Sequence, residues 1–275
     1  MINTLIEMFS YTFLVRAFFV GILVALCCSL LGVSLVLKRY SMIGDALSHV
    51  GFGALAIATA LHTAPLAISI PIVISAAFLL LRISENSKIK GDAAIALIST
   101  SSLAIGVVII SLTTGMNTDV CNYMFGSILA MSQGDVVLSI ALSICVLILY
   151  IIFYNKIFAV TFDESFAKAT GIRANIYNMI VAFLTAITVV IGMRLMGALL
   201  ISCLVIFPAL TSMRICKRFF TVTICAAIIS VICFFVGIVA SYLFATPTGA
   251  SVVLANIIMF CLFWITALVR GRNHA

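Results

Sequence analysis

The sequence predicts an all-α polytopic membrane protein with eight to nine transmembrane helices, and three observations lead to this prediction. Hydrophobic residues make up 65% of the 275 residues, whereas charged residues make up only 8%. The mean hydropathy is +1.36, far above that of soluble domains. At about 20 residues per span plus short loops, this length accommodates roughly eight to ten helices. We therefore expect a single transmembrane domain over residues 1–275, with no soluble domain beside it.

Apolar runs mark the expected helices in chain order. The runs cover roughly residues 11–37, 42–62, 65–81, 92–115, 135–155, 176–193, 195–213, 219–245 and 249–269. The turn between the sixth and seventh runs, at residues 193–197, is very tight. If one of these two runs is re-entrant, the number of spans falls to eight. Residues 246–249, Thr-Pro-Thr-Gly, predict a turn between the last two helices.

The basic residues predict how the helices are oriented in the membrane. If successive loops alternate between the two sides, every Lys and Arg except Arg16 and Arg194 lies on one side. Basic residues concentrate in cytoplasmic loops, so we expect the C-terminus in the cytoplasm and the N-terminus outside. The net charge of +7 does not indicate nucleic-acid binding, because the basic residues are dispersed at segment ends.

Two loops and one proline interrupt this pattern of spans. The external loop 116–134 contains a stretch that is too apolar for open solvent and too short to span, and this favours a re-entrant segment over about 119–130. A loop packed on the outer rim fits its composition equally well. Tyr123 and Phe125 in this stretch are candidates for a gate. Pro208 predicts a kink in the seventh run, because proline removes a backbone donor and blocks the carbonyl four residues earlier.

The cytoplasmic loop after the fifth run predicts a short helix over about 162–171. Thr161 or Asp163 can cap its start, Glu164 places an acid in the first turn, and Gly171 is positioned to end it. Phe166 contributes to an apolar side, together with Phe162 and Ala169, and the small Ala167 allows close contact. Such a helix can dock into a groove on a cytosolic partner, or it can lie on the membrane surface as an amphipathic connector.

The strongest candidate site is an acid and an imidazole one helical turn apart, Asp45 and His49, in the second run. Residues four apart share a helix face, so their side chains can converge on one point. A carboxylate and an imidazole together suit a divalent transition metal. Alternatively, Asp45 caps the helix or pairs with a nearby base, and His49 donates a hydrogen bond between helices. Both residues lie within an apolar run, where ionisable groups usually mark a substrate or proton route. Their position therefore favours a binding site over these alternatives.

Two ligands do not complete a metal site, and the membrane segments offer few others. Asp92 and Asp135 sit at segment starts, where helix capping explains them. A two-fold homodimer would bring both copies of Asp45 and His49 together as an Asp2His2 set on the axis. This predicts a translocation path at the dimer interface.

The sequence also limits the source of energy for transport. It contains no G-x-x-x-x-G-K-[ST] motif, so the chain does not bind ATP by a P-loop. A proton-coupled secondary metal carrier is the competing class, but it would need further buried titratable residues for a proton relay, and the sequence offers almost none. A membrane scaffold or receptor component would not need a buried acid–imidazole pair.

Five stretches resemble the zinc/manganese branch of ATP-binding-cassette importer permeases, a branch that also imports iron. They occur in family order across nearly the whole chain. The stretches are residues 38–49, which contain Gly44, Asp45 and His49; 123–126, Tyr-Met-Phe-Gly; 162–171; 197–200 with Pro208 and Ala209; and 246–251.

The resemblance implies a homodimeric permease in the bacterial cell membrane, surrounded by membrane lipid, with a fold similar to cobalamin-type importer permeases. It implies two cytosolic ABC ATPase subunits and an external metal-binding lipoprotein as partners. In this reading the chain is not itself an enzyme and has no cofactor of its own; zinc or manganese is its cargo, coordinated by Asp45 and His49. The helix over 162–171 becomes the coupling element to the ATPase, with Asp163, Glu164, Phe166, Ala167 and Gly171 as its candidate residues.

Overall fold

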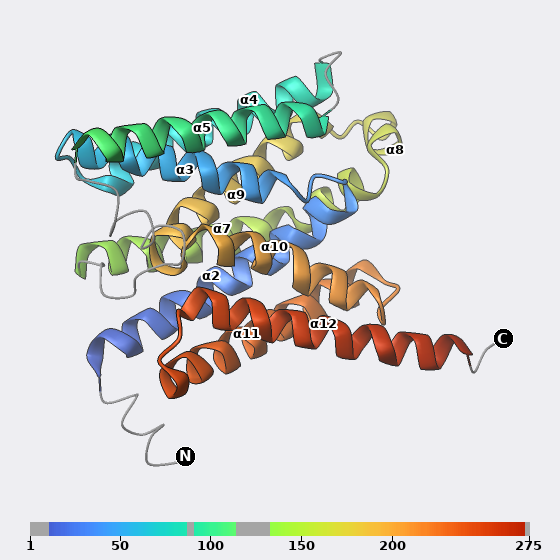
Figure 1. Cartoon of the computed structure of the whole chain (residues 1–275). Coiled ribbons are helices and arrows are strands. Elements are labelled where there is room, and N and C mark those ends of the chain that lie inside the picture. The colour runs from blue at the N-terminus through green and yellow to red at the C-terminus, as the bar shows by residue number, and fades with distance from the viewer. Residues whose placement is uncertain (1–10, 87–90, 114–132, 273–275) are drawn as a thin grey trace.

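The computed structural model describes residues 11–86, 91–113 and 133–272, and in these ranges the chain is helical without any strand (Figure 1). The re-entrant segment expected over about 119–130, with Tyr123 and Phe125, lies outside the described residues. In chain order the helices are α2 (Thr12–Leu37), α3 (Ile43–Ala60), α4 (Pro65–Asn86), α5 (Gly91–Thr113), α7 (Gln133–Phe162), α8 (Glu164–Ala169), α9 (Ala174–Met196), α10 (Ala198–Met213), α11 (Phe219–Phe244) and α12 (Thr248–Arg272).

Eight of the described helices are long and apolar enough to cross a membrane, which confirms the predicted fold class. The seventh apolar run forms α10, which has 16 residues and is therefore about 24 Å long at ~1.5 Å per residue. It is shorter than the ~30 Å hydrocarbon core of a bilayer. The tight turn before it is a single residue, Gly197, with φ 81° and ψ 161°. A positive φ of this kind strongly favours glycine, so Gly197 lets α10 begin directly after α9.

The long helices lie side by side along one direction, with α4 and α5 at one side of the bundle and α11 and α12 at the other (Figure 1). Successive helices run in opposite directions. The C-terminal ends of α2, α4, α7 and α12 therefore meet at the same end of the bundle as α8 (Figure 1). Among the described residues, Lys38 and Arg39 after α2 and Lys168 of α8 lie at that end.

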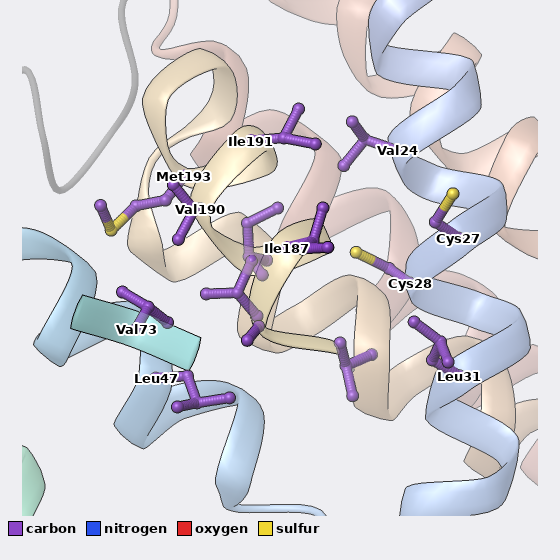
Figure 2. Close-up of a cluster of buried hydrophobic side chains, with 14 of the residues drawn as sticks. Val24, Cys27, Cys28, Leu31, Leu47, Val73, Ile187, Val190, Ile191 and Met193 are labelled. Atoms are coloured by element: carbon purple, nitrogen blue, oxygen red, sulfur yellow. The ribbon is translucent and has the colours of Figure 1, made fainter. Parts of the chain in front are cut away.

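The core is built around α9, which packs against α2, α3, α4, α7 and α10. Figure 2 shows buried side chains of α2 facing those of α9, with one residue each from α3 and α4 on the other side of α9. The labelled residues are Val24, Cys27, Cys28 and Leu31 of α2, Ile187, Val190, Ile191 and Met193 of α9, Leu47 of α3 and Val73 of α4. Helix association in lipid depends on such van der Waals contact, because lipid is as apolar as the side chains.

Glycine allows α2 and α10 to approach each other closely. A Cβ atom at Gly32 would lie 2.0 Å from the carbonyl oxygen of Val205, a distance that real Cβ atoms do not reach. The backbone of α10 thus rests directly on α2. Pro208 lies inside α10, and the helix continues on both sides of it; its kink remains a prediction. The expected turn before the last helix is present, since α11 ends at Phe244, Ala245 adopts a left-handed conformation and α12 begins at Thr248.

The short helix expected after the fifth run is present as α8, and its local signals are those expected. Asp163 caps it, because its carboxylate accepts a hydrogen bond of 2.9 Å from the backbone N–H of Phe166. Gly171 follows its end with φ 82°, the conformation typical of the residue after a helix C-cap. The helix begins at Glu164 rather than 162, because α7 extends to Phe162 and only Asp163 separates the two helices. Thr161 lies within α7 and is not the cap.

Candidate metal site

Asp45 and His49 converge on one point at the start of α3. Asp45 lies in the first turn of this helix and His49 one turn later. His49 Nε2 lies 3.6 Å from Asp45 Oδ2, which is longer than a normal hydrogen bond. Two ligands of a tetrahedral ion at about 2.1 Å each would lie ~3.4 Å apart. The two atoms are thus spaced almost as two ligands of one metal ion would be.

Ser202 of α10 adds a contact to Asp45. Its hydroxyl donates a hydrogen bond of 3.0 Å to Asp45 Oδ1 and also lies 3.4 Å from the carbonyl oxygen of Ala198 in its own helix. One carboxylate oxygen is therefore held by α10, and the other faces His49. Sequence reasoning did not identify Ser202. A helical serine usually bonds its own backbone, so only its place in the block from Gly197 to Pro208 could have drawn attention to it.

Small residues allow α3 to lie close to its neighbours. Gly44 packs against Val205 of α10, where an added Cβ would be in ordinary contact at 3.6 Å. On the other side, a Cβ at Gly53 would lie 2.8 Å from the carbonyl oxygen of Ser102 in α5. The position of Asp45 beside Ser202 therefore follows from close backbone packing of α3 between α10 and α5.

The pair opens onto the surface of the single chain. The side chain of Asp45 is 38% exposed and that of His49 is 22% exposed. Apolar side chains of the same elements are exposed too, since Met42 before α3 and Leu199 and Leu210 of α10 are all more than one-third exposed. A carboxylate and an imidazole thus face outward from an otherwise apolar part of the bundle.

In the part of the chain that the structure describes, Asp45 and His49 do not belong to a complete metal cage. Among the residues that the structure describes, no group of three or more His, Cys, Asp or Glu side chains is arranged to hold a metal ion. Asp135, which the sequence suggested as a helix cap, lies in the first turn of α7 and forms a two-pronged ion pair with Arg194 of α9, at 3.0 Å and 3.1 Å. It therefore has a structural partner far along the chain.

The candidate coupling residues are distributed over α8 and its ends. Phe166 is 65% exposed, whereas Ala167 is fully buried against Val160 and Ala174. The close contact that Ala167 allows is therefore with the bundle itself, and the accessible apolar surface of α8 is that of Phe166 and Ala169. Gly171 is exposed, with no atom near the position that a Cβ would occupy.

Glu164 links α8 to other parts of the chain. It forms ion pairs with Lys168 at 2.7 Å and with Lys38 of α2 at 3.6 Å, and it accepts a hydrogen bond of 3.2 Å from Asn178 of α9. The hydrogen bond from Lys168 lowers the pKa of Glu164 below its usual 4.5, against partial burial, which raises it; Asn178 and the charge of Lys38 add to the lowering. The carboxylate is therefore ionised at neutral pH.

Residues 10–267 match the sequence model described as the ABC 3 transport family. The chain belongs to the ABC 3 transport family. The family expected from the sequence motifs is thereby confirmed, and the chain is a multi-pass membrane protein of that family.

Two curated members and one solved structure show how far the similarity extends. The chain is 28% identical to a manganese transport system membrane protein of Halalkalibacterium halodurans, over 96% of this chain and 91% of the relative. It is 29% identical to a high-affinity zinc uptake system membrane protein of Haemophilus influenzae, over 92% and 97%. It superimposes with a TM-score of 0.86 on a chain of PsaBC from Streptococcus pneumoniae, solved in complex with a Fab, at 28% identity over 96% and 95% of the two chains.

Proposed function

We propose that this chain is the membrane-spanning permease subunit of an ATP-driven importer of divalent transition metal ions, and that the ion passes Asp45 and His49. The observation that carries the proposal is the 3.6 Å spacing of Asp45 Oδ2 and His49 Nε2 inside a membrane helix. Similar family members are named for manganese and for zinc transport. A carboxylate and an imidazole together suit zinc, manganese and iron.

A second copy of the chain would complete the site. Each chain supplies two strong ligands, whereas zinc commonly takes four and manganese more. The pair is partly exposed on the surface of the single chain, as expected for groups that a symmetric partner covers. A two-fold axis through this surface would bring two Asp45 and two His49 side chains together, and the ion would pass along that axis.

The energy would come from partners on the α8 side of the membrane. The sequence contains no P-loop, so ATP hydrolysis belongs to two cytosolic ABC ATPase subunits that dock at α8 and contact the exposed Phe166. Basic residues at that end favour a cytoplasmic position for it and for the C-terminus. An external metal-binding lipoprotein would deliver the ion at the opposite face. We place the complex in the bacterial cell membrane.

Metal uptake by proteoliposomes tests the proposal. The chain, reconstituted with its cytosolic ABC ATPase partner, should accumulate Mn²⁺ or Zn²⁺ only when ATP is present. The double variant Asp45→Ala, His49→Ala should assemble normally and lose uptake. His62→Asn is a matched control, because His62 is an exposed histidine beyond the end of α3 with φ 51°, a conformation that asparagine tolerates. Uptake by this control should equal that of the wild type.

Two results would contradict the proposal. Normal uptake by the double variant would show that Asp45 and His49 are not on the metal path. Uptake that proceeds without ATP and follows a proton gradient would instead support a proton-coupled secondary carrier.

A further inference from the structure

Three polar residues from three helices meet at the inner end of the bundle, and we name Lys38, Glu164 and Asn178 the Lys38 junction. Lys38, at the end of α2, is only 14% exposed. Its ammonium donates a hydrogen bond to Asn178 Oδ1 on α9 and pairs with Glu164 Oε2 on α8 at 3.6 Å. Asn178 is buried and donates from its amide nitrogen to the same Glu164 oxygen. Each of the three side chains therefore contacts the other two.

The junction is rigidly connected to the first turn of α3. Arg39, directly after Lys38, adopts a left-handed conformation with φ 61°. Its N–H donates to the Val36 carbonyl at 3.1 Å, and the N–H of Tyr40 donates to the Leu35 carbonyl at 2.8 Å. This is the pair of bonds that defines a Schellman helix end. The N–H of Ile43 then donates to the Tyr40 carbonyl at 3.0 Å. A displacement of Lys38 is therefore passed through a closed backbone corner to Asp45, two residues further on.

Hydrogen bonds close both ends of helix α8, so Glu164 moves together with the helix. The Asp163 cap closes its start. At its other end, the N–H of Gly171 donates to the Lys168 carbonyl at 3.1 Å and that of Ile172 to the Ala167 carbonyl at 2.9 Å. The buried Ala167 holds the helix against α7 and α9. A partner that pushes on the exposed side of α8 would therefore move Glu164 with the helix as one unit.

We propose that the Lys38 junction is a positioning element that transmits the displacement of α8 to the first turn of α3, and so to the Asp45 carboxylate. The inference rests on the proposed function, because it assumes that an ATPase acts on α8. Separating Lys38 from Glu164 would take from the largely buried Lys38 ammonium its ion pair with Glu164, whereas Glu164 would keep Lys168 within α8. Moving α8 and the α2–α3 corner together avoids that cost. The established contacts thus favour joint movement over slippage.

The test compares three lysines, of which only Lys38 joins α8 to another helix. Lys38→Gln removes the charge that bridges α2 and α8. Lys168→Gln removes a partner of the same Glu164, but that partner lies within α8 itself. Lys156→Gln removes an exposed lysine of α7 that is outside the junction. Lys38→Arg keeps the charge and several donors.

The measured quantity is the amount of Mn²⁺ or Zn²⁺ transported per ATP hydrolysed in proteoliposomes with the ATPase, alongside pull-down of the ATPase. We expect Lys38→Gln to keep the pull-down and lower this ratio by about fivefold or more. The ratio of metal transported to ATP hydrolysed should fall less in Lys168→Gln than in Lys38→Gln. Lys38→Arg should retain most of this ratio, and Lys156→Gln should leave it unchanged. In the double variant Lys38→Gln, Glu164→Gln, the second change should add less than about twofold to the loss, because the two side chains act through each other.

Several outcomes would overturn the inference. A ratio for Lys38→Gln equal to that of Lys156→Gln would show that the junction transmits nothing, and loss of the pull-down would show that Lys38 acts in docking. Losses that multiply in the double variant would show that Lys38 and Glu164 act independently. If Lys38→Gln fails to assemble, Glu164→Gln must show the same fall in the ratio, or the inference is wrong. Absence of ATP-dependent metal uptake by the wild type would instead overturn the proposed function itself, and this inference with it.

Discussion

The hydroxyl of Ser202 donates a hydrogen bond of 3.0 Å to Asp45 Oδ1, although the two residues are 157 positions apart. This bond joins α10 to the first turn of α3. It orients the carboxylate so that its second oxygen faces His49 at 3.6 Å. The geometry of the candidate metal site therefore depends on α10 as well as on the helix that carries both ligands.

Replacing Ser202 tests this dependence. In Ser202→Ala, Asp45 loses the bond that orients it, so we expect the affinity for Mn²⁺ or Zn²⁺ to fall by about tenfold, as is typical when a ligand loses its supporting hydrogen bond. Calorimetric metal titration of the purified protein measures this. Ser212→Ala is the control on the same helix, because Ser212 bonds the carbonyl of Ala209 in α10 itself. Equal affinities for the two variants would show that Ser202 does not support the site.

The two glycines that pack against Val205 should respond differently to an added methyl group. In Gly32→Ala the Cβ would lie 2.0 Å from a backbone oxygen, so we expect a loss of about 1–3 kcal/mol of stability from overpacking. In Gly44→Ala the Cβ would be in ordinary contact with the Val205 side chain at 3.6 Å. Alanine is also the better helix former, so this variant should be neutral or more stable. Thermal unfolding in detergent separates the two, and a less stable Gly44→Ala would contradict the packing described.

The ion pairs of Glu164 predict a dependence of stability on pH. Its pKa in the folded chain is below the usual 4.5, chiefly because of the hydrogen bond from Lys168. Its contribution to stability is therefore fully present above about pH 4.5 and is lost as the pH falls through the lower folded pKa. We expect the difference in unfolding midpoint between wild type and Glu164→Gln to shrink between about pH 6 and pH 3. A difference that stays constant over this range would contradict the prediction.

The ion pair of Arg194 and Asp135 should stabilise the end of the bundle opposite α8. Its side chains are only 15% and 17% exposed, and both guanidinium contacts are at hydrogen-bond distance. We expect Arg194→Met to lower the free energy of unfolding by about 1–3 kcal/mol, because Asp135 loses a charged partner. The double variant Arg194→Met, Asp135→Asn should recover part of that loss, since the remaining charge is removed. Denaturation in detergent measures both, and a double variant that is less stable than the single one would contradict the pairing.

Local features of the fold could be predicted from the sequence. The apolar runs predicted the spans, because a membrane helix is defined by its length and hydrophobicity. Asp163 and Gly171 predicted the cap and the end of α8, because both signals act within one turn of the residue. The convergence of Asp45 and His49 followed from their separation of four residues. The end of α7 was misplaced, since the run 135–155 continues as helix to Phe162 where no helix breaker intervenes.

Contacts between distant helices could not be predicted in the same way. Ser202 and Asp45, and Lys38 and Glu164, meet only because α10 and α8 pack where they do, and no local pattern encodes that packing. The small size of Ala167 correctly indicated close contact, but not that the contact is with Val160 and Ala174 inside the bundle. The ion pair of Asp135 with Arg194 is likewise a long-range contact, which the position of Asp135 at a segment start did not indicate.

Metal titration of the purified protein is the most direct test of the central claim that Asp45 and His49 bind the transported ion on a dimer axis. The wild type should bind one Mn²⁺ or Zn²⁺ ion per two chains. The double variant Asp45→Asn, His49→Gln should form the same dimer and bind the ion at least about 100-fold more weakly. Unchanged affinity in the double variant, or one ion per chain in the wild type, would contradict the account.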